Sequence, residues 1–319
     1  MSLPILGVFQ QALLPIALIM TIGYLWRRWR PGGLDVLQVR AAINNMVLYA
    51  TYPALAFHVV SGVRIDADII WAPALEWLAI FAGLGLAAAL FTPLLRRGTL
   101  TATGFGALLL GSSLTNLISL GIPVQQAALG EAAARYAIYA DILGIAPLFW
   151  TLGIWVAIRF GSGDPALARP GNFLRMLLRL PPSWAFAAGI LVNVLGIPVP
   201  AGIDEGARML GYATMPCMLL TVGMSLSFAS FRRYPGLVLA VSAIKLVAVP
   251  LIVLGAGAAL LGMSETTVAM TLAAGMPTMM ATIVLSERFG LDTELLATVM
   301  VGTTIAYFLT LPVWLRVLA

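Results

Sequence analysis

The feature that most constrains this chain is its succession of apolar stretches, each long enough to cross a lipid bilayer as a helix. About 20 mostly apolar residues span the hydrocarbon core, and the 319-residue sequence contains ten such stretches. They cover residues 5–26, 40–61, 70–95, 101–130, 133–159, 182–198, 206–229, 235–261, 265–288 and 294–318. Only 10% of the residues are charged, against about 25% in a soluble domain. The sequence therefore predicts an all-α polytopic membrane protein and excludes a water-soluble enzyme or a nucleic-acid-binding protein.

The arginines predict how the chain is oriented in the membrane. Counted together with the ends of the adjoining spans, loops after the odd-numbered spans contain thirteen arginines, and loops after the even-numbered spans contain three. Cytoplasmic loops carry the excess of positive charge. The odd-numbered loops, including the long connection 161–181, are therefore expected in the cytoplasm, and both termini outside.

A weak internal repeat divides the chain into two halves. Residues 49–53 read Tyr-Ala-Thr-Tyr-Pro and residues 212–216 read Tyr-Ala-Thr-Met-Pro, an offset of 163 residues. We interpret residues 1–160 and 182–319 as two five-helix repeats, joined by the loop 161–181. An odd number of helices places the second repeat upside down relative to the first, and such inverted repeats are typical of secondary transporters.

Spans 4 and 9 are predicted to be broken helices. A straight helix over residues 99–131 would be about 50 Å long, whereas the hydrocarbon core is about 30 Å thick. The predicted break covers Asn116–Pro123, because the sequence Gly121-Ile122-Pro123 does not favour a regular helix. In span 9 the predicted break is Ala274–Thr278, with a simple proline kink as the alternative. Unwound backbone at this depth must line a cavity or be buried in protein.

Two ionisable residues are predicted to lie deep in the membrane. Asp141 is in span 5, and Lys245, the only lysine, is in span 8. Charges at such depth are costly and are candidates for function by default. Lys245 is expected to neutralise Asp141, or Asp141 is expected to exchange a proton during transport. The alternative is a purely structural pair that holds the two helices together.

Polar groups at the predicted break of span 4 suit a carboxylate ligand. Asn116 offers an amide, and Ser113 and Thr115 offer hydroxyls beside the N-terminus of a half-helix, which favours anions. The alternative is that these groups only satisfy neighbouring backbone. His58 is expected near the outer interface. Most of the tryptophans at positions 26, 29, 71, 77 and 314, Trp77 and Trp314 among them, are interpreted as interface anchors.

Signatures of catalysis and metal binding are absent from the sequence. It contains no GxSxG or HExxH motif, and a single histidine cannot form a histidine-based metal cluster. We expect no catalytic residue, no metal site and no cofactor. A channel and a membrane-embedded sensor remain alternatives to a transporter.

Several motifs together resemble the auxin efflux carrier family. The stretch 116–123, Asn-Leu-Ile-Ser-Leu-Gly-Ile-Pro, followed by Leu-Gly-Glu at 129–131, is similar to the fourth-helix signature of that family. The same order of motifs continues with Pro181-Pro182, residues 196–200 (Gly-Ile-Pro-Val-Pro), Gly223–Leu226, Lys245 with Pro250, and Pro277 followed by Glu287–Gly290. The resemblance extends over nearly the whole chain.

The resemblance implies an organic-anion transporter with an elevator mechanism. Helices 1, 2, 6 and 7 would form a scaffold, helices 3–5 and 8–10 a mobile transport bundle, and helices 2 and 7 a homodimer interface. The broken helices 4 and 9 would cross at the substrate site. The substrate-binding candidates are then Ser113, Thr115, Asn116, Gly121, Pro123, Met276, Pro277 and Thr278, with Asp141 and Lys245 as a charge or proton relay. The expected substrate is a small organic carboxylate, and the expected location is a bacterial inner membrane. The few deep positive groups favour a monocarboxylate over a dicarboxylate. Because span 9 has no acid between Glu265 and Glu287 that could bind sodium, we expect uniport or proton coupling.

Overall fold

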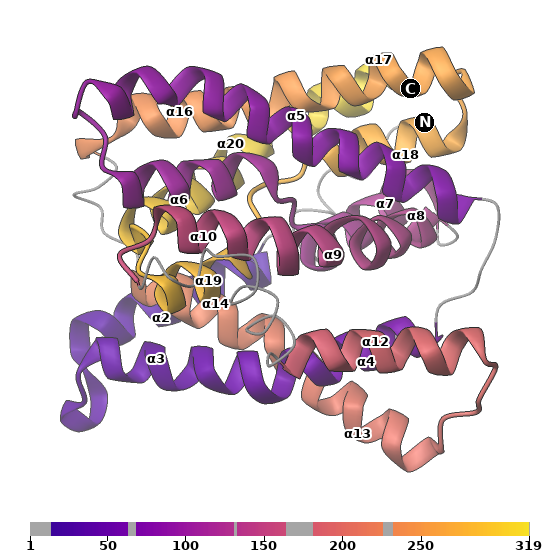
Figure 1. Cartoon of the computed structure of the whole chain (residues 1–319), viewed down its shortest axis with the longest axis horizontal. Coiled ribbons are helices and arrows are strands. Elements are labelled where there is room, and N and C mark those ends of the chain that lie inside the picture. The colour runs from indigo at the N-terminus through magenta and orange to yellow at the C-terminus, as the bar shows by residue number, and fades with distance from the viewer. Residues whose placement is uncertain (1–13, 63–67, 131–132, 164–180, 226–231, 319) are drawn as a thin grey trace. The chain divides into compact units, whose positions relative to one another are not determined.

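A computed structural model describes residues 14–62, 68–130, 133–163, 181–225 and 232–318 (Figure 1). Across these residues every regular element is a helix, apart from a two-residue bridge between Thr115 and Thr278. The all-helical prediction is confirmed. Most of the predicted loop 161–181 lies outside the described residues, as does Glu131 of the fourth-helix motif.

The helices of the first part of the chain follow the predicted apolar spans. They are α2 (Leu14–Trp29), α3 (Val36–Met46), α4 (Tyr52–Gly62), α5 (Asp68–Arg96), α6 (Ala102–Ser113), α7 (Ile122–Leu129), α8 (Ala134–Tyr139), α9 (Ala146–Leu148) and α10 (Ile154–Phe160). A short 3-10 turn, η2 (Pro31–Gly33), precedes α3. Four π-helical turns interrupt the others: η3 (Val47–Thr51), η4 (Leu117–Gly121), η6 (Ala140–Ile145) and η7 (Phe149–Gly153).

The second part of the chain also consists of helices interrupted by a π-helical turn. Its helices are α12 (Pro181–Val194), α13 (Ala201–Tyr212), α14 (Thr214–Ser225), α16 (Pro235–Ala243), α17 (Val249–Leu261), α18 (Glu265–Ala274), α19 (Thr282–Phe289) and α20 (Thr293–Val317). One π-helical turn, η9 (Ile244–Ala248), joins α16 to α17.

Four helical segments are long and apolar enough to cross a membrane by length and composition. They are Ile70–Arg96, Arg135–Phe160, Pro235–Leu261 and Thr293–Val317. Other predicted spans contain shorter helices, such as α6 and α7, which an extended segment separates. The number of ten crossings and the inverted repeat stay predictions.

The contacts divide the chain into two compact units. Unit 1 comprises residues 1–17, 66–162 and 226–319, and unit 2 comprises residues 18–65 and 163–225. Each unit combines segments from both halves of the sequence. A unit is therefore not one of the two predicted sequence repeats.

Within unit 2, small residues allow α2 and α14 to approach closely. A Cβ atom on Gly23 would lie 3.1 Å from the Cα of Gly223 and would overlap the carbonyl oxygen of Leu220. A Cβ on Gly223 would in turn overlap the backbone of Met20. Glycine at both positions lets the two backbones touch, which is a common way for membrane helices to pack.

Within unit 1, side-chain caps determine where three of the helices begin. The Thr101 hydroxyl accepts a hydrogen bond from the Gly104 N–H (3.1 Å) at the start of α6, and Ser264 caps α18 in the same way. A carboxylate oxygen of Asp292 accepts from the Leu295 N–H (2.9 Å) at the start of α20. Such caps satisfy backbone donors that have no partner inside the helix.

Helix α5 packs against both α6 and α17 in unit 1 (Figure 1). The backbones of α5 and α6 approach closely at Gly83, where a Cβ atom would lie 3.1 Å from the Cα of Ser113 and would overlap the carbonyl oxygen of Ser112. The backbone of α5 therefore rests on the last turn of α6. This contact is where the chain leaves α6 for the extended segment described below.

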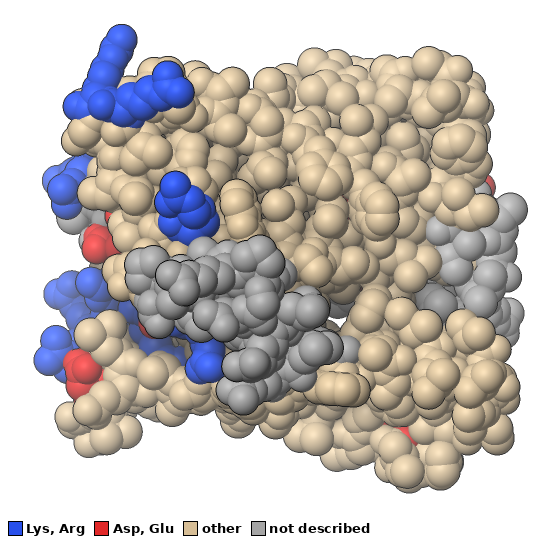
Figure 2. Space-filling view, in the orientation of Figure 1, with Lys and Arg blue, Asp and Glu red and all other residues tan. Residues whose placement is uncertain are grey.

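Basic side chains gather at helix ends. Arg27 and Arg28 lie in the last turn of α2, Arg96 in that of α5 and Arg159 in that of α10. In Figure 2 charged side chains are few, and wide areas of the drawn face carry no Lys, Arg, Asp or Glu side chain. These arginines follow predicted spans 1, 3 and 5, whose loops are the ones expected in the cytoplasm.

We expect Gly83→Ala to lower the melting temperature of the detergent-purified protein. The new methyl group would overlap the Ser112 carbonyl oxygen, and overpacking of this kind costs about 1–3 kcal/mol. Gly85→Ala, two residues along the same helix, is the matched control, because a Cβ there meets nothing within 4 Å. Equal melting temperatures of the two variants would contradict the close packing of α5 on α6.

Candidate functional site

Two interrupted helices of unit 1 cross through a short extended segment in each. The first interruption separates α6, which ends at Ser113, from η4; the second separates α18 from α19. Thr115 and Thr278 form an antiparallel bridge between the two segments. The Asn116 N–H donates to the Pro277 carbonyl (3.0 Å), and the Met279 N–H donates to the Leu114 carbonyl (3.0 Å). We call this pairing of residues 114–116 with residues 277–279 the crossing.

The predicted break in span 9 is confirmed, whereas the predicted break in span 4 was placed too late. Helix α18 ends at Ala274, inside the predicted range. In span 4, however, Gly121 has helical angles (φ −63°, ψ −48°) and Pro123 lies in the first turn of α7, where proline is tolerated. The helix stops earlier, at Leu114 (φ −91°, ψ 134°). The predicted range therefore overlaps the break only at Asn116, and the backbone is helical at the Gly-x-Pro sequence.

Thr278 is tied to both sides of the crossing. Its hydroxyl donates to the Gly111 carbonyl of α6 (2.6 Å). Thr303 of α20 places its hydroxyl 3.3 Å from the Thr278 hydroxyl and accepts from the Thr278 N–H at 3.3 Å. Sequence reasoning missed Thr303, because one threonine among several in an apolar span has no distinguishing signal.

Lys245 supports the other segment of the crossing. Its side chain is fully buried. The ammonium group donates to the Thr115 hydroxyl at 2.6 Å and to the Ser113 carbonyl at 3.3 Å. The single cation of η9 is thus bound to the end of α6 and to the bridge residue itself.

The expected ion pair between Lys245 and Asp141 is not formed among the described residues. The acid that interacts electrostatically with Lys245 is Glu76 of α5, which also interacts with Thr115. Glu76 is fully buried, and neither of its carboxyl oxygens has a hydrogen-bond partner of regular geometry within the described part of the chain. The prediction was wrong because span membership determines depth but does not determine which helices are neighbours.

Glu76 is the most important residue that sequence reasoning missed. The same signal that singled out Asp141 applies to it: one acid in the otherwise apolar span 70–95. Asp141 lies in the π-helical turn η6, is almost buried, and interacts electrostatically with Glu76. Unit 1 therefore brings one cation and two acids together from α5, η6 and η9.

Two polar groups beside the crossing are buried without a hydrogen-bond partner in the described structure. They are the Asn116 amide nitrogen and the Ser112 hydroxyl. An unsatisfied buried donor costs about 1–3 kcal/mol, and a ligand that accepts a hydrogen bond would remove this cost. Of the predicted ligands, Asn116 is thus available, whereas Ser113 already donates to the Leu109 carbonyl (2.8 Å) and Thr115 accepts from Lys245.

Of the remaining predicted ligands, Pro277 belongs to the crossing, whereas Met276, Gly121 and Pro123 lie outside its paired residues. Met276 is fully buried, and the Pro277 carbonyl accepts the hydrogen bond from Asn116. Gly121 is buried inside the helical run that follows the crossing. Pro123 belongs to α7, and its side chain lies outside the described part of the structure.

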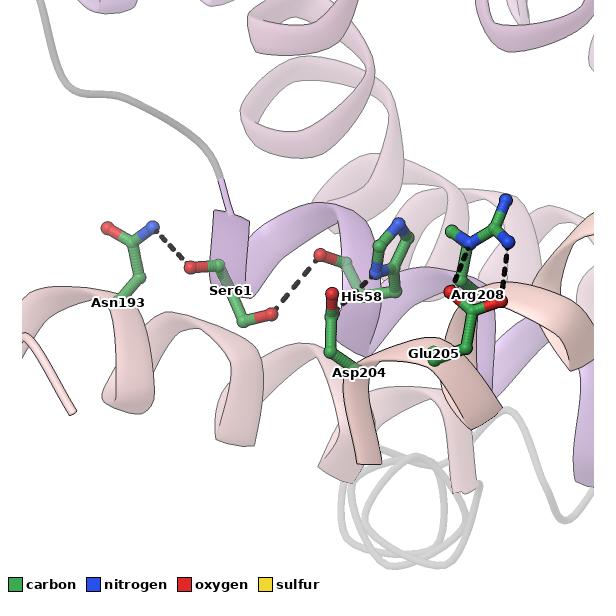
Figure 3. A network of polar contacts seen from close by, with 6 residues as sticks. All are labelled: His58, Ser61, Asn193, Asp204, Glu205 and Arg208. Atoms are coloured by element: carbon green, nitrogen blue, oxygen red, sulfur yellow. Dashed lines mark hydrogen bonds and ion pairs between the residues drawn. The ribbon is translucent and has the colours of Figure 1, made fainter. Parts of the chain in front are cut away.

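His58 belongs to a separate polar network in unit 2 (Figure 3). Its ring Nδ1 lies 2.6 Å from a carboxylate oxygen of Asp204 and so links α4 to α13. The Ser61 hydroxyl donates to the His58 carbonyl (3.1 Å), and Asn193 of α12 donates to the Ser61 carbonyl (3.0 Å). These contacts join three helices of unit 2, whereas the crossing is built entirely by unit 1.

Comparisons with known proteins point to membrane transport. A family model described as "Membrane transport protein" matches residues 8–161 and 168–315. An uncharacterized transporter of Methanothermobacter thermautotrophicus is 27% identical over 286 residues, which cover 87% of this chain and 89% of the relative. The uncharacterized transporter MJ1031 of Methanocaldococcus jannaschii is 26% identical over 281 residues, 85% and 87% of the two chains. The uncharacterized transporter YfdV of Escherichia coli K12 is 24% identical over 309 residues, 96% of each chain.

We expect Lys245→Met to be strongly destabilising and Glu76→Gln to rescue it. Removing the cation leaves the Glu76 carboxylate buried and uncompensated, which costs about 3–5 kcal/mol. The double variant removes both charges, so its melting temperature should return most of the way to that of the unmodified protein. Asp141→Asn in the Lys245→Met background is the matched comparison. A better rescue by Asp141→Asn would show that Asp141, not Glu76, balances Lys245.

Proposed function

Because the chain belongs to the membrane transport protein family, which includes the auxin efflux carriers, we propose that it is a secondary transporter of small organic anions. The protein is a membrane transporter and not an enzyme. The observation that carries the finer proposal is the side-chain amide nitrogen of Asn116, which has no hydrogen-bond partner in the described structure and lies at the crossing of two broken helices in unit 1. Broken helices with polar groups at their ends are the usual binding device of secondary transporters.

A carboxylate fits the groups that the crossing leaves available. The Asn116 amide nitrogen and the Ser112 hydroxyl can both donate hydrogen bonds. Two half-helices, η4 with α7 and α19, begin directly after the extended segments, and helix N-termini attract negative charge. These features support an anionic group of the substrate bound beside Asn116.

The charges around the crossing favour a monocarboxylate over a dicarboxylate. Among the described residues, Lys245 is the one cation that contacts the crossing, and Glu76 already offsets its charge. Asp141 adds a second acid near Glu76. A second carboxylate on the substrate would lack a cation and would be costly to bury. The apolar remainder of the substrate would lie against buried side chains such as Met276 and Met279.

Glu76 and Asp141 are the groups that we propose for proton coupling, with uniport as the alternative. Burial disfavours the charged form of a carboxyl group when no hydrogen bond compensates for the lost water. Protonation of one of the two acids would reduce their mutual repulsion, and binding of an anionic substrate nearby would favour that protonation. Lys245 would act as a permanent counter-charge during this exchange.

The division into units supports an elevator mechanism. Unit 1 contains the crossing with Lys245, Glu76 and Asp141, and unit 2 contains α3, α4, α12, α13 and α14. In the proposed cycle, unit 1 carries the substrate across the membrane and unit 2 is the fixed scaffold. A homodimer through predicted spans 2 and 7 would hold the scaffold in place; α13, at the start of span 7, exposes Ile203, Met209 and Leu210. The proposed location is a bacterial inner membrane, with both termini outside.

Solid-supported-membrane electrophysiology on proteoliposomes tests the function directly. We would apply mono- and dicarboxylates, indole acetate included, with and without sodium and with and without a pH gradient. Saturable currents or counterflow with monocarboxylates, dependent on the pH gradient, support the proposal. Sodium-dependent currents would contradict proton coupling, non-saturable flux would indicate a channel, and binding without flux would indicate a sensor.

We expect Asn116→Ala to weaken substrate binding by about 10- to 100-fold without loss of folding. Hydrogen bonds to charged groups contribute about 1.5–3 kcal/mol, and each 1.4 kcal/mol is a tenfold change in affinity. The measurement is the half-saturating substrate concentration for counterflow, with the melting temperature as the check on folding. Gln38→Ala is the matched control, since it removes a carboxamide from the exposed surface of α3. Unchanged half-saturation in Asn116→Ala would show that the substrate binds elsewhere.

A further inference from the structure

Two of the π-helical turns in unit 1 carry the ionisable residues of the candidate site. Asp141 lies in η6 and Lys245 lies in η9. In each turn a backbone N–H reaches a carbonyl five residues earlier, from Ala146 to Asp141 and from Val249 to Ile244. Such turns are rare and occur frequently at functional sites.

A proline follows each of these turns at the position that leaves one carbonyl without its helical donor. In an α-helix the Leu143 carbonyl would accept from residue 147, and the Leu246 carbonyl from residue 250. These residues are Pro147 and Pro250, which have no N–H group. A wide π-helical turn also relieves the clash between the proline ring and the preceding turn. Both turns therefore need a donor from outside their own helix.

A tryptophan indole supplies that donor in both cases. Trp314 of α20 donates to the Leu246 carbonyl at 2.8 Å. Trp77 of α5 donates to the Leu143 carbonyl at 3.2 Å and to the Gly144 carbonyl at 3.1 Å. Trp314 is 7% exposed, so the interpretation of this residue as an interface anchor is wrong.

We propose that Trp314 and Trp77 are positioning residues that hold the two π-helical turns in place and thereby place Lys245 and Asp141. The functional meaning of this placement rests on the function proposed above. A π-helical turn holds one more residue than a turn of α-helix. If it changed to α-helical geometry, the helix on one side of it would rotate by the angle of one residue, about 100°. The Lys245 ammonium would then leave the Thr115 hydroxyl and the end of α6.

Trp314 has the stronger role of the two. Its hydrogen bond is buried and has a single acceptor next to Lys245 in the chain. Trp77 is 44% exposed and shares its N–H between two carbonyls. Trp77 directly follows Glu76 in α5, so one helix supplies both the counter-charge of Lys245 and the donor that supports the turn of Asp141.

The chain contains its own probe for this proposal, because Lys245 is the only lysine. Protein produced with ¹³Cε-lysine and purified in detergent gives one lysine side-chain NMR signal from Lys245. Trp314→Phe keeps a large ring and removes only the N–H donor, and we expect it to shift the signal or split it into two. Trp155→Phe, at an exposed position of α10, is the matched control and should leave the signal unchanged. A lower melting temperature with an unmoved lysine signal would mean that Trp314 is merely structural and would overturn the proposal.

A second variant tests the reason for the hydrogen bond. Pro250→Ala restores a backbone N–H beside Leu246, so Trp314→Phe should disturb the lysine signal much less in that background. An equal disturbance in both backgrounds would overturn the proposal. If Trp314→Phe alone does not fold, recovery of folded protein with Pro250→Ala supports the proposal, and failure of the double variant contradicts it. These signals are recorded without substrate, so they are independent of whether the transport assay succeeds.

Discussion

The pairing of two extended segments at the crossing is the constraint on which unit 1 depends. A membrane helix that stops in the apolar region exposes backbone groups that lipid cannot satisfy. Here Leu114–Asn116 and Pro277–Met279 satisfy each other, with hydrogen bonds on both sides of the Thr115–Thr278 bridge. Neither interruption could persist alone, so the two broken helices depend on one another.

Other helices of unit 1 supply side chains that hold this pairing. Lys245 binds Thr115 and the end of α6, while Thr303 and Gly111 hold Thr278. Most polar groups at the crossing are used in this way. The Asn116 amide nitrogen is left over, and its position beside the starts of two half-helices is what connects the architecture to anion binding. Under the proposed function, the binding site would thus be a by-product of how the breaks are satisfied.

The sequence predicted correctly those features that follow from composition or local chemistry. It did not predict features that depend on which helices pack together. Hydrophobic stretches predicted an all-helical membrane protein, and Gly275-Met276-Pro277 marked the break in span 9 correctly. The similar pattern at Gly121–Pro123 was misleading, because proline at the start of a half-helix is compatible with helical backbone. Lys245 was recognised as deep and important, but its acidic neighbour is Glu76 instead of Asp141. Trp314 was taken for an interface anchor although it is buried beside η9.

The sequence by itself determined the membrane class, the family and the identity of several candidate residues, since these follow from hydrophobic length, from motif order and from the rarity of charges in apolar spans. It also contained Pro147 and Pro250, which leave two carbonyls without helical donors. Only the tertiary structure decided which groups meet those needs: Trp77 and Trp314 for the carbonyls, Glu76 for Lys245, and Pro277 for Asn116. Partners that lie between 66 and 169 residues apart are selected by helix packing, and neither hydropathy nor local spacing encodes that choice.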